Sequence, residues 1–167
     1  MNAATSTDAG RGGRIGSLIV FLVVPQLVGV LGALGTGTGM TPWYAELNKP
    51  SFQPPSWVFG PVWTLLYLSM GYAAWRVYQH WPRDAARRTA LTWFGAQLVL
   101  NAAWSPIFFG AHAITLALGV IVLLWIAVLG TILTFRKVDA LASYLLWPYL
   151  AWVSFATVLN AAIVHLN

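Results

Sequence analysis

The sequence predicts an all-α integral membrane protein, built as a bundle of five transmembrane helices. Its composition is the first reason: 59% of the 167 residues are hydrophobic, only 8% are charged, and the mean hydropathy is +0.70. Soluble domains are far less apolar. The second reason is that five uncharged stretches each come near or exceed the roughly 20 residues with which a helix crosses a bilayer. These stretches are residues 15–34, 56–75, 89–109, 113–135 and 140–166.

The first stretch follows Arg11 and Arg14, a pattern that a cleavable secretory peptide shares. Its apolar part is longer than the usual run of roughly 7 to 15 residues, and no clear small-x-small cleavage site follows it. We therefore expect it to stay in the protein. Residues 1–14 are then an N-terminal tail, and residues 15–167 form one five-helix domain.

The second stretch begins inside NKPSFQPPSWVFGPVW, residues 48–63. Pro54 and Pro55 suit the start of a helix, where a missing backbone N–H is tolerated. Pro61 is expected to kink the helix near Trp57, a residue typical of the aromatic belt at a membrane surface. One face of this helix carries a stripe at helical spacing: Trp63, Tyr67, Met70 and Gly71.

Two later stretches carry polar and aromatic side chains on one face each. In 89–109 the face holds Gln97, Asn101, Trp104, Ser105 and Phe108, and in 140–166 it holds Tyr149, Trp152, Ala156 and Asn160. Amides are costly to expose to hydrocarbon, so the three amides should point inward. There they either bond a neighbouring helix or line a cavity, and the adjacent tryptophans favour a cavity for a flat organic ligand.

The basic residues set the expected orientation. Arginines and lysine flank one end of the bundle, at Arg11, Arg14, Arg76, Arg83, Arg87, Arg88, Arg136 and Lys137, and only Lys49 lies at the other end. The positive-inside rule then predicts a cytoplasmic N-terminus, with the C-terminus and the long loop 35–55 across the membrane. This topology explains the net charge of +5 without a nucleic acid.

Several classes of protein are disfavoured. All four acidic and nine basic residues fall outside the helix centres, whereas proton-coupled transporters generally need a charge there. His80, His112 and His165 are too scattered for a metal site. No nucleophile elbow, HExxH or phosphate loop is present. We expect no metal and no obligatory cofactor.

Three blocks resemble the translocator protein / tryptophan-rich sensory protein (TspO/MBR) family. They are WYAELNKPSFQPPSWVFGPVWTLLYLSMGYA at 43–73, AQLVLNAAWSPIFFGA at 96–111 and WPYLAWVSFATVLN at 147–160. The resemblance implies a five-helix bundle, often a homodimer, that binds porphyrins such as protoporphyrin IX. It also implies binding of isoquinoline and benzodiazepine ligands.

Carried onto matching positions, the resemblance implies a ligand pocket under the long loop. Tyr44 and Pro54 would be lid residues, and the walls would be Trp63, Asn101, Trp104, Ser105, Trp152 and Ala156. After ATVLN, animal members continue with an aromatic pair and a basic residue, the proposed cholesterol motif. Here Ala161, Ala162 and His165 follow, so we do not expect cholesterol recognition.

Three hypotheses of function follow. The favoured one is a tetrapyrrole-binding sensor or regulator, followed by a transporter of porphyrins or other small hydrophobes. The third is an enzyme that degrades protoporphyrin IX in light, with Trp63 and Trp152 as redox-active aromatics. For a homodimer, Gly29 and Ala33, extended by Gly32 and Gly35, offer one close-packing surface, and Gly95 with Ala102 offers another.

Overall fold

A computed structural model describes residues 4–34, 42–80 and 82–167, with side chains placed for all of these except 4–12, 33 and 34. Within this part of the chain the protein is helical and contains no β-strand. Five helices have at least 20 residues: α1 (Ala4–Leu34), α3 (Phe59–Gln79), α4 (Ala85–Ser105), α5 (Ile114–Arg136) and α7 (Trp147–Leu166). The short helices are α2 (Pro42–Glu46), η1 (Ser56–Val58), η2 (Pro106–Gly110) and α6 (Ala140–Tyr144).

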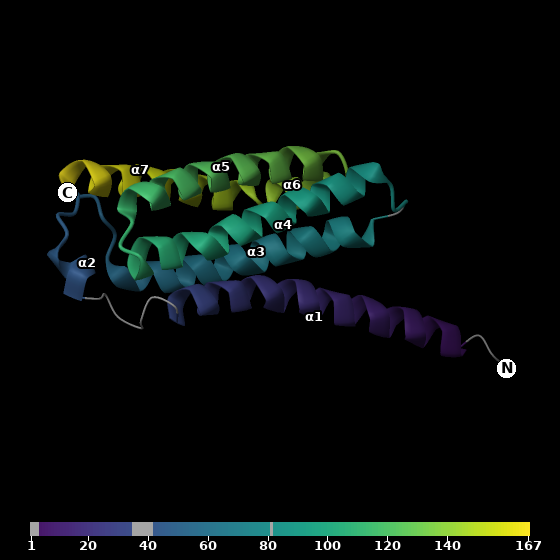
Figure 1. The fold of residues 1–167 in the computed structure, drawn as a ribbon. Coiled ribbons are helices and arrows are strands. Elements are labelled where there is room, and N and C mark those ends of the chain that lie inside the picture. The colour runs from purple at the N-terminus through teal and green to yellow at the C-terminus, as the bar shows by residue number, and fades with distance from the viewer. Residues whose placement is uncertain (1–3, 35–41, 81) are drawn as a thin grey trace.

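The long helices run side by side along one axis, with α1 packed on α3 and diverging from the bundle toward its own start (Figure 1). The start of α1, the α3–α4 connection and the α5–α6 connection share one end of the bundle. The opposite end holds α2, the α4–α5 connection and the end of α7 (Figure 1). The basic residues of the two connections therefore gather at one end, as the sequence predicted.

Three described segments are long and apolar enough to cross a membrane, by length and composition: Gly13–Gly32, Ile114–Arg136 and Ala140–Leu166. These segments support a membrane protein. The other two expected spans, in α3 and α4, do not meet the same measure. Trp and Tyr side chains lower the hydropathy of α3, and Trp and amide side chains lower that of α4. Several of these face the interior of the bundle, among them Tyr67, Gln97 and Asn101.

Two expectations about prolines need correction. Pro61 does not kink a helix, because η1 ends at Val58 and α3 begins only at Phe59. Pro61 thus lies in the first turn of α3, where its missing N–H has no partner to lose.

The stretch 140–166 is not one continuous helix, because α6 ends at Tyr144 and α7 begins at Trp147. Pro148 explains the break, since it cannot donate to the carbonyl four residues earlier.

The predicted tail is also partly helical, since α1 begins at Ala4 rather than near residue 15. Glycines set how closely this helix approaches α3. A Cβ atom on Gly71 of α3 would collide with the backbone of Phe21, and one on Gly29 of α1 would collide with the ring of Tyr67. Gly29 therefore faces α3 of its own chain and is not part of a free dimer surface. The Ala33 side chain and Gly35 lie outside the described residues.

One ion pair ties the basic end together. Arg76 of α3 contacts Asp139 with an Nη2–Oδ2 distance of 2.8 Å. Asp139 also caps α6, because its Oδ1 accepts the backbone N–H of Ala142 at 2.9 Å. Burial alone would raise the pKa of Asp139, but the Ala142 N–H and the Arg76 guanidinium outweigh it, and this pKa lies below its ordinary value. The pair joins α3 to the α5–α6 connection.

Candidate functional site

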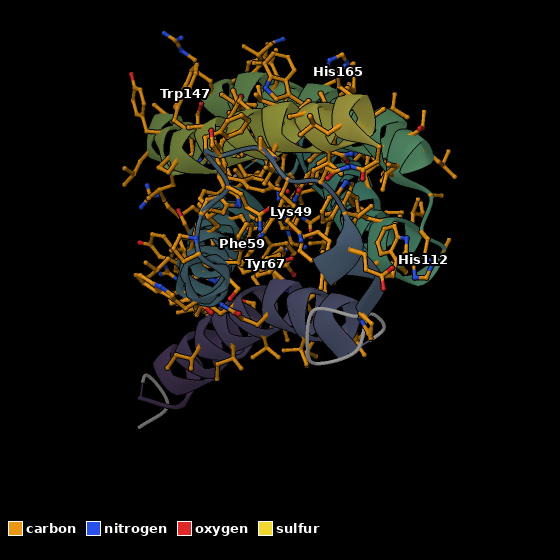
Figure 2. All side chains as sticks on the ribbon, turned by 90° about the vertical axis from the view of Figure 1, so that its left-hand side faces the viewer. Lys49, Phe59, Tyr67, His112, Trp147 and His165 are labelled. Carbon is orange, nitrogen blue, oxygen red and sulfur yellow. The ribbon has the colours of Figure 1, made fainter. Side chains whose placement is uncertain are left out.

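A cavity of about 510 Å³ lies between the long helices, beneath α2 and the segment that follows it. Figure 2 looks onto this end of the molecule, with Lys49 and Phe59 toward the middle and His112 at the rim. The lining residues come from α1, α2, η1, α3, α4, η2, α5 and α7 and from Gln53. The aromatic ones are Tyr44, Phe59, Trp63, Tyr67, Trp104, Phe108, Phe109 and Trp152. Aromatic rings thus come from several sides of the cavity.

Seven of the eight residues expected at the ligand site line this cavity: Tyr44, Trp63, Asn101, Trp104, Ser105, Trp152 and Ala156. Pro54 does not line it. Its neighbours Gln53 and Ser56 do, and Pro54 lies in the extended segment between them. The wall residues that helical spacing grouped thus lie around one cavity, and the role of all eight residues in ligand binding stays a prediction.

The aromatic rings support one another around the cavity. Trp63 is stacked on Tyr67 with ring centroids 5.2 Å apart and meets Tyr149 edge-on at 6.1 Å. On the next wall Trp104 is stacked on Phe108 at 5.1 Å. Trp152 meets the ring of Phe59 edge-on at 5.7 Å. Such contacts favour one orientation of each ring.

A buried chain of hydrogen bonds forms part of the cavity floor. The Tyr67 hydroxyl donates to Asn101 Oδ1 at 2.7 Å, and Asn101 Nδ2 donates to the Tyr149 hydroxyl at 3.0 Å. The Tyr149 hydroxyl in turn donates to Gln97 Oε1 at 3.0 Å. The chain links α3, α4 and α7. Asn101 therefore has both of the roles that the sequence left open, because it hydrogen-bonds neighbouring helices and lines the cavity. Gln97 hydrogen-bonds Tyr149 and does not line the cavity.

A second set of hydrogen bonds fixes Trp104. Its indole N–H donates to Asn160 Oδ1 at 3.1 Å, and Asn160 Nδ2 donates to the backbone oxygen of Ile114 at 3.1 Å. Ser105 Oγ donates to the backbone oxygen of Gly32 at 3.3 Å, which ties α4 to α1. The prediction that Gln97, Asn101 and Asn160 point inward is confirmed, because their exposed fractions are 1%, 7% and 1%.

The described part of the loop that is expected to act as a lid begins at residue 42. Tyr44 of α2 is buried against Phe108 and Phe109, with ring centroids 6.1 and 5.2 Å away. Lys49 Nζ lies 4.9 Å from the centroid of the Tyr44 ring. Burial raises the pKa of the Tyr44 hydroxyl, and a hydrogen bond with the Gln53 side chain offsets part of this rise. Trp43 stacks on His112 at 4.1 Å.

A clasp between Asn48 and Asn167 holds the lid to the end of α7. The Asn48 backbone N–H donates to Asn167 Oδ1 at 3.0 Å, and Asn167 Nδ2 returns a bond to the Asn48 oxygen at 3.1 Å. Asn48 Nδ2 also donates to the Leu166 oxygen at 3.2 Å. Sequence reasoning did not find this clasp. Its two asparagines are 119 positions apart, and no local spacing connects them.

The chemistry of the cavity is apolar and aromatic. No Asp, Glu, Lys, Arg or His is among the described residues that line it. No group of three His, Cys, Asp or Glu side chains in the described part of the chain is placed to hold a metal ion. Aromatic faces with a few fixed polar groups suit a flat, largely apolar ring system held by stacking.

Fold and site together define a helical membrane protein with an aromatic cavity closed by a loop. The sequence matches the TspO/MBR family over residues 21–166. The chain belongs to this family.

Individual relatives agree with the family match. The chain is 43% identical to the tryptophan-rich protein TspO of Chlorobaculum tepidum over 153 residues, which cover 87% of this chain and 96% of the relative. It is 44% identical to the human translocator protein over 119 residues, with 71% and 70% covered. It is 41% identical to the tryptophan-rich sensory protein of Cereibacter sphaeroides over 134 residues, with 79% and 82% covered. These relatives support a sensory or regulatory membrane role in the family.

Proposed function

We propose that this protein is a membrane sensor or regulator that binds a tetrapyrrole of the protoporphyrin IX or haem type. The observation that carries the proposal is the cavity of about 510 Å³ walled by Trp63, Trp104 and Trp152. This volume falls within the roughly 300 to 1,000 Å³ of small-molecule sites. A macrocycle offers the flat apolar faces that indole rings stack against.

The mode of binding follows from the residues in the walls. None of the described lining residues is His, Cys or Met, and the hydroxyls of the two lining tyrosines, Tyr44 and Tyr67, are already hydrogen-bonded to Gln53 and Asn101. A tetrapyrrole would therefore be held by stacking, and a metal-free ring would serve as well as a metallated one. The same walls suit smaller fused-ring compounds such as isoquinolines and benzodiazepines, which we expect to compete for the site.

We also propose that the five long helices all cross the membrane, with α3 and α4 shielded by their neighbours. The N-terminus would be cytoplasmic, because the basic connections at Arg83 to Arg88 and at Arg136 and Lys137 share the end at which α1 starts. We also propose that the protein is a homodimer, as its resemblance to the family implies. Gly95 of α4 is the better candidate for its interface, because a Cβ atom there would meet nothing within 4 Å.

A titration with protoporphyrin IX in detergent tests the binding proposal. The absorbance of the porphyrin itself should be followed, because quenching of ten tryptophans does not locate the ligand. Ala156→Leu should weaken binding by filling the cavity, since Ala156 lines it. Trp147→Leu is the matched control, because Trp147 is 50% exposed and lies outside the cavity. Equal affinity in wild type and Ala156→Leu would contradict the proposal.

A second candidate function is light-driven degradation of the bound porphyrin. It is favoured by the stack of Trp63 on Tyr67, whose hydroxyl is bonded to Asn101, because an oxidised indole would have a hydrogen-bonded phenol beside it. Illumination of the complex in air should then bleach the porphyrin absorbance, and Trp63→Phe or Trp152→Phe should slow the bleaching. Bleaching at the rate of free porphyrin in detergent would exclude this function.

A further inference from the structure

A second hollow lies on the outer face of α4, near the start of the helix. It is lined by Ala85, Arg88, Thr89, Thr92, Trp93 and Ala96. These positions recur every three or four residues and so share one face of the helix. Ala85 and Ala96, at the two ends of this face, have short side chains, whereas Arg88 and Trp93 between them have long ones. The face is therefore hollowed into a groove. It is separate from the aromatic cavity and shares no lining residue with it.

Trp93 forms the fixed wall of this groove. Its ring lies directly against Gly130 of α5, where a Cβ atom would come within 2.6 Å of Trp93 Cε3. The side chain is still 37% exposed. The indole N–H groups of Trp75, Trp104 and Trp125 are bonded within the chain, whereas that of Trp93 has no such bond among the described residues. This donor is available to a ligand in the groove.

Arg88 places an unpaired positive charge at the mouth of the groove. The one ion pair in the described part of the chain is Arg76–Asp139. Asp84, the acid closest to Arg88 in the sequence, caps α4, where its Oδ1 accepts the Arg87 N–H at 2.9 Å, and it forms no ion pair with Arg88. Arg87 itself faces away, with its guanidinium 4.8 Å from the centroid of the Tyr78 ring. Arg88 is thus exposed at the groove and has no ion-pair partner among the described residues.

Thr89 and Thr92 are the other polar residues that line the groove. Thr92 Oγ1 already donates to the Arg88 backbone oxygen at 3.0 Å. No bond of the Thr89 hydroxyl is found within the described residues, so this hydroxyl can donate next to the Arg88 guanidinium. Below them, Trp93 and Ala96 continue as an apolar surface toward the exposed Val99. The groove is therefore cationic at its outer end and apolar at its inner end.

We propose that this groove is a binding site for an anionic phospholipid. Its phosphate binds Arg88 and the Thr89 hydroxyl, an ester carbonyl accepts the Trp93 indole N–H, and an acyl chain lies along Ala96. Guanidinium groups bind phosphate with two parallel hydrogen bonds, and indoles sit at the level of the headgroups. A second copy of the chain would bring another Arg88 to this face across a two-fold axis, whereas a phosphate brings the opposite charge. A dimer contact through Gly95 and Ala102 would lie further along α4, away from Arg88 at the start of the helix.

Native mass spectrometry of the protein in detergent tests the site, with short-chain phosphatidylglycerol as the probe and phosphatidylcholine of the same chain length for comparison. Wild type should bind phosphatidylglycerol in preference. Arg88→Gln should weaken that binding by about fivefold, as expected for one basic residue at a membrane surface, and Trp93→Leu should weaken both lipids. Arg83→Gln is the control, because Arg83 is exposed at the same end of the bundle and does not line the groove.

Three results would overturn the proposal. The first is equal loss of binding in Arg83→Gln and Arg88→Gln, which would show a diffuse charge effect rather than a site. The second is competition by inorganic phosphate at millimolar concentration as effective as that by the lipid, which would show an anion site without lipid recognition. The third is a change in oligomeric state of Arg88→Gln with lipid binding unaltered, which would make this face a contact between copies.

Discussion

The Tyr67 hydroxyl and Asn101 Oδ1 are 2.7 Å apart, in a bond that ties α3 to α4 at the floor of the cavity. Asn101 is then held from its other end by Tyr149 of α7. One amide thus sets the spacing of three helices that form the walls. The stability of the bundle and the shape of its cavity depend on the same bond.

Tyr67→Phe should lower the stability of the protein by about 1–3 kcal/mol, because it leaves a buried amide oxygen without its donor. Thermal unfolding in detergent, followed by circular dichroism, measures the change. Tyr144→Phe is a suitable control, since Tyr144 is 62% exposed. Equal midpoints for Tyr67→Phe and wild type would mean that water or another donor replaces the hydroxyl.

The sequence was sufficient to predict the long helices and the faces that meet inside the bundle. Asn101, Trp104 and Ser105, and Trp152 with Ala156, lie where helical spacing placed them, because apolar and polar faces must segregate in a bundle. The details of helix ends were not predictable in the same way. α3 begins only at Phe59, and the helix is broken before Trp147. Both boundaries depend on which backbone hydrogen bond Pro61 or Pro148 is unable to donate.

Contacts between segments that are distant in the sequence could not be predicted from it either. The Asn48–Asn167 clasp and the stack of Trp43 on His112 bring loops together with helix ends, and no periodicity describes a loop. His112 has a φ of 55°, a left-handed conformation that is unusual for a histidine. Its place in the short α4–α5 connection was predicted, but its contact with the lid was not.

Asn48→Ala should loosen the lid, because it removes the amide that donates to the Leu166 oxygen and weakens the paired bonds with Asn167. Faster hydrogen exchange is expected over residues 42–50, together with faster release of bound protoporphyrin IX by a few-fold, about 1 kcal/mol for a lost hydrogen bond. Ser51→Ala, an exposed position nearby, controls for general loop effects. An unchanged release rate would show that the clasp does not limit escape of the ligand.

Asp139→Asn should reduce the dependence of stability on acid pH. The folded pKa of Asp139 is depressed, so its contribution is present above the ordinary pKa of about 4 and is lost as pH falls through the folded value. Wild type should therefore lose more stability than Asp139→Asn on going from neutral pH to below about pH 4. The asparagine keeps a cap oxygen for Ala142, so the variant mainly removes the charge that faces Arg76.

Asp84→Asn is the matched control for this experiment. Asp84 caps α4 as Asp139 caps α6, but it has no ion pair among the described residues. Its replacement should cost less at neutral pH than that of Asp139, for which about 1 kcal/mol is expected from a partly exposed pair. Equal effects of the two variants on the pH profile would mean that capping, and not the pairing with Arg76, is the source of the stabilisation.

Substitutions of Trp152 distinguish ligand binding from photochemistry at this residue. This residue lines the cavity one helical turn from Ala156, and its ring is braced by Phe59 and Phe155. An aromatic stack is worth about 0.5 to 1.5 kcal/mol beyond the area it buries. Trp152→Phe should therefore keep most of the affinity for protoporphyrin IX and lose at most about tenfold, whereas Trp152→Ala should lose more. A titration of each variant measures the difference.

Phenylalanine stacks nearly as well as tryptophan but is much harder to oxidise. If the protein degrades porphyrin in light, Trp152→Phe retains binding and loses light-driven turnover, because the indole is the group that exchanges electrons with the excited ring. If the protein only senses its ligand, wild type and Trp152→Phe both bind, and neither shows turnover above that of free porphyrin. Unaltered affinity in Trp152→Ala would place the ligand elsewhere and remove Trp152 from the site, since a lining residue cannot lose its ring without loss of contact.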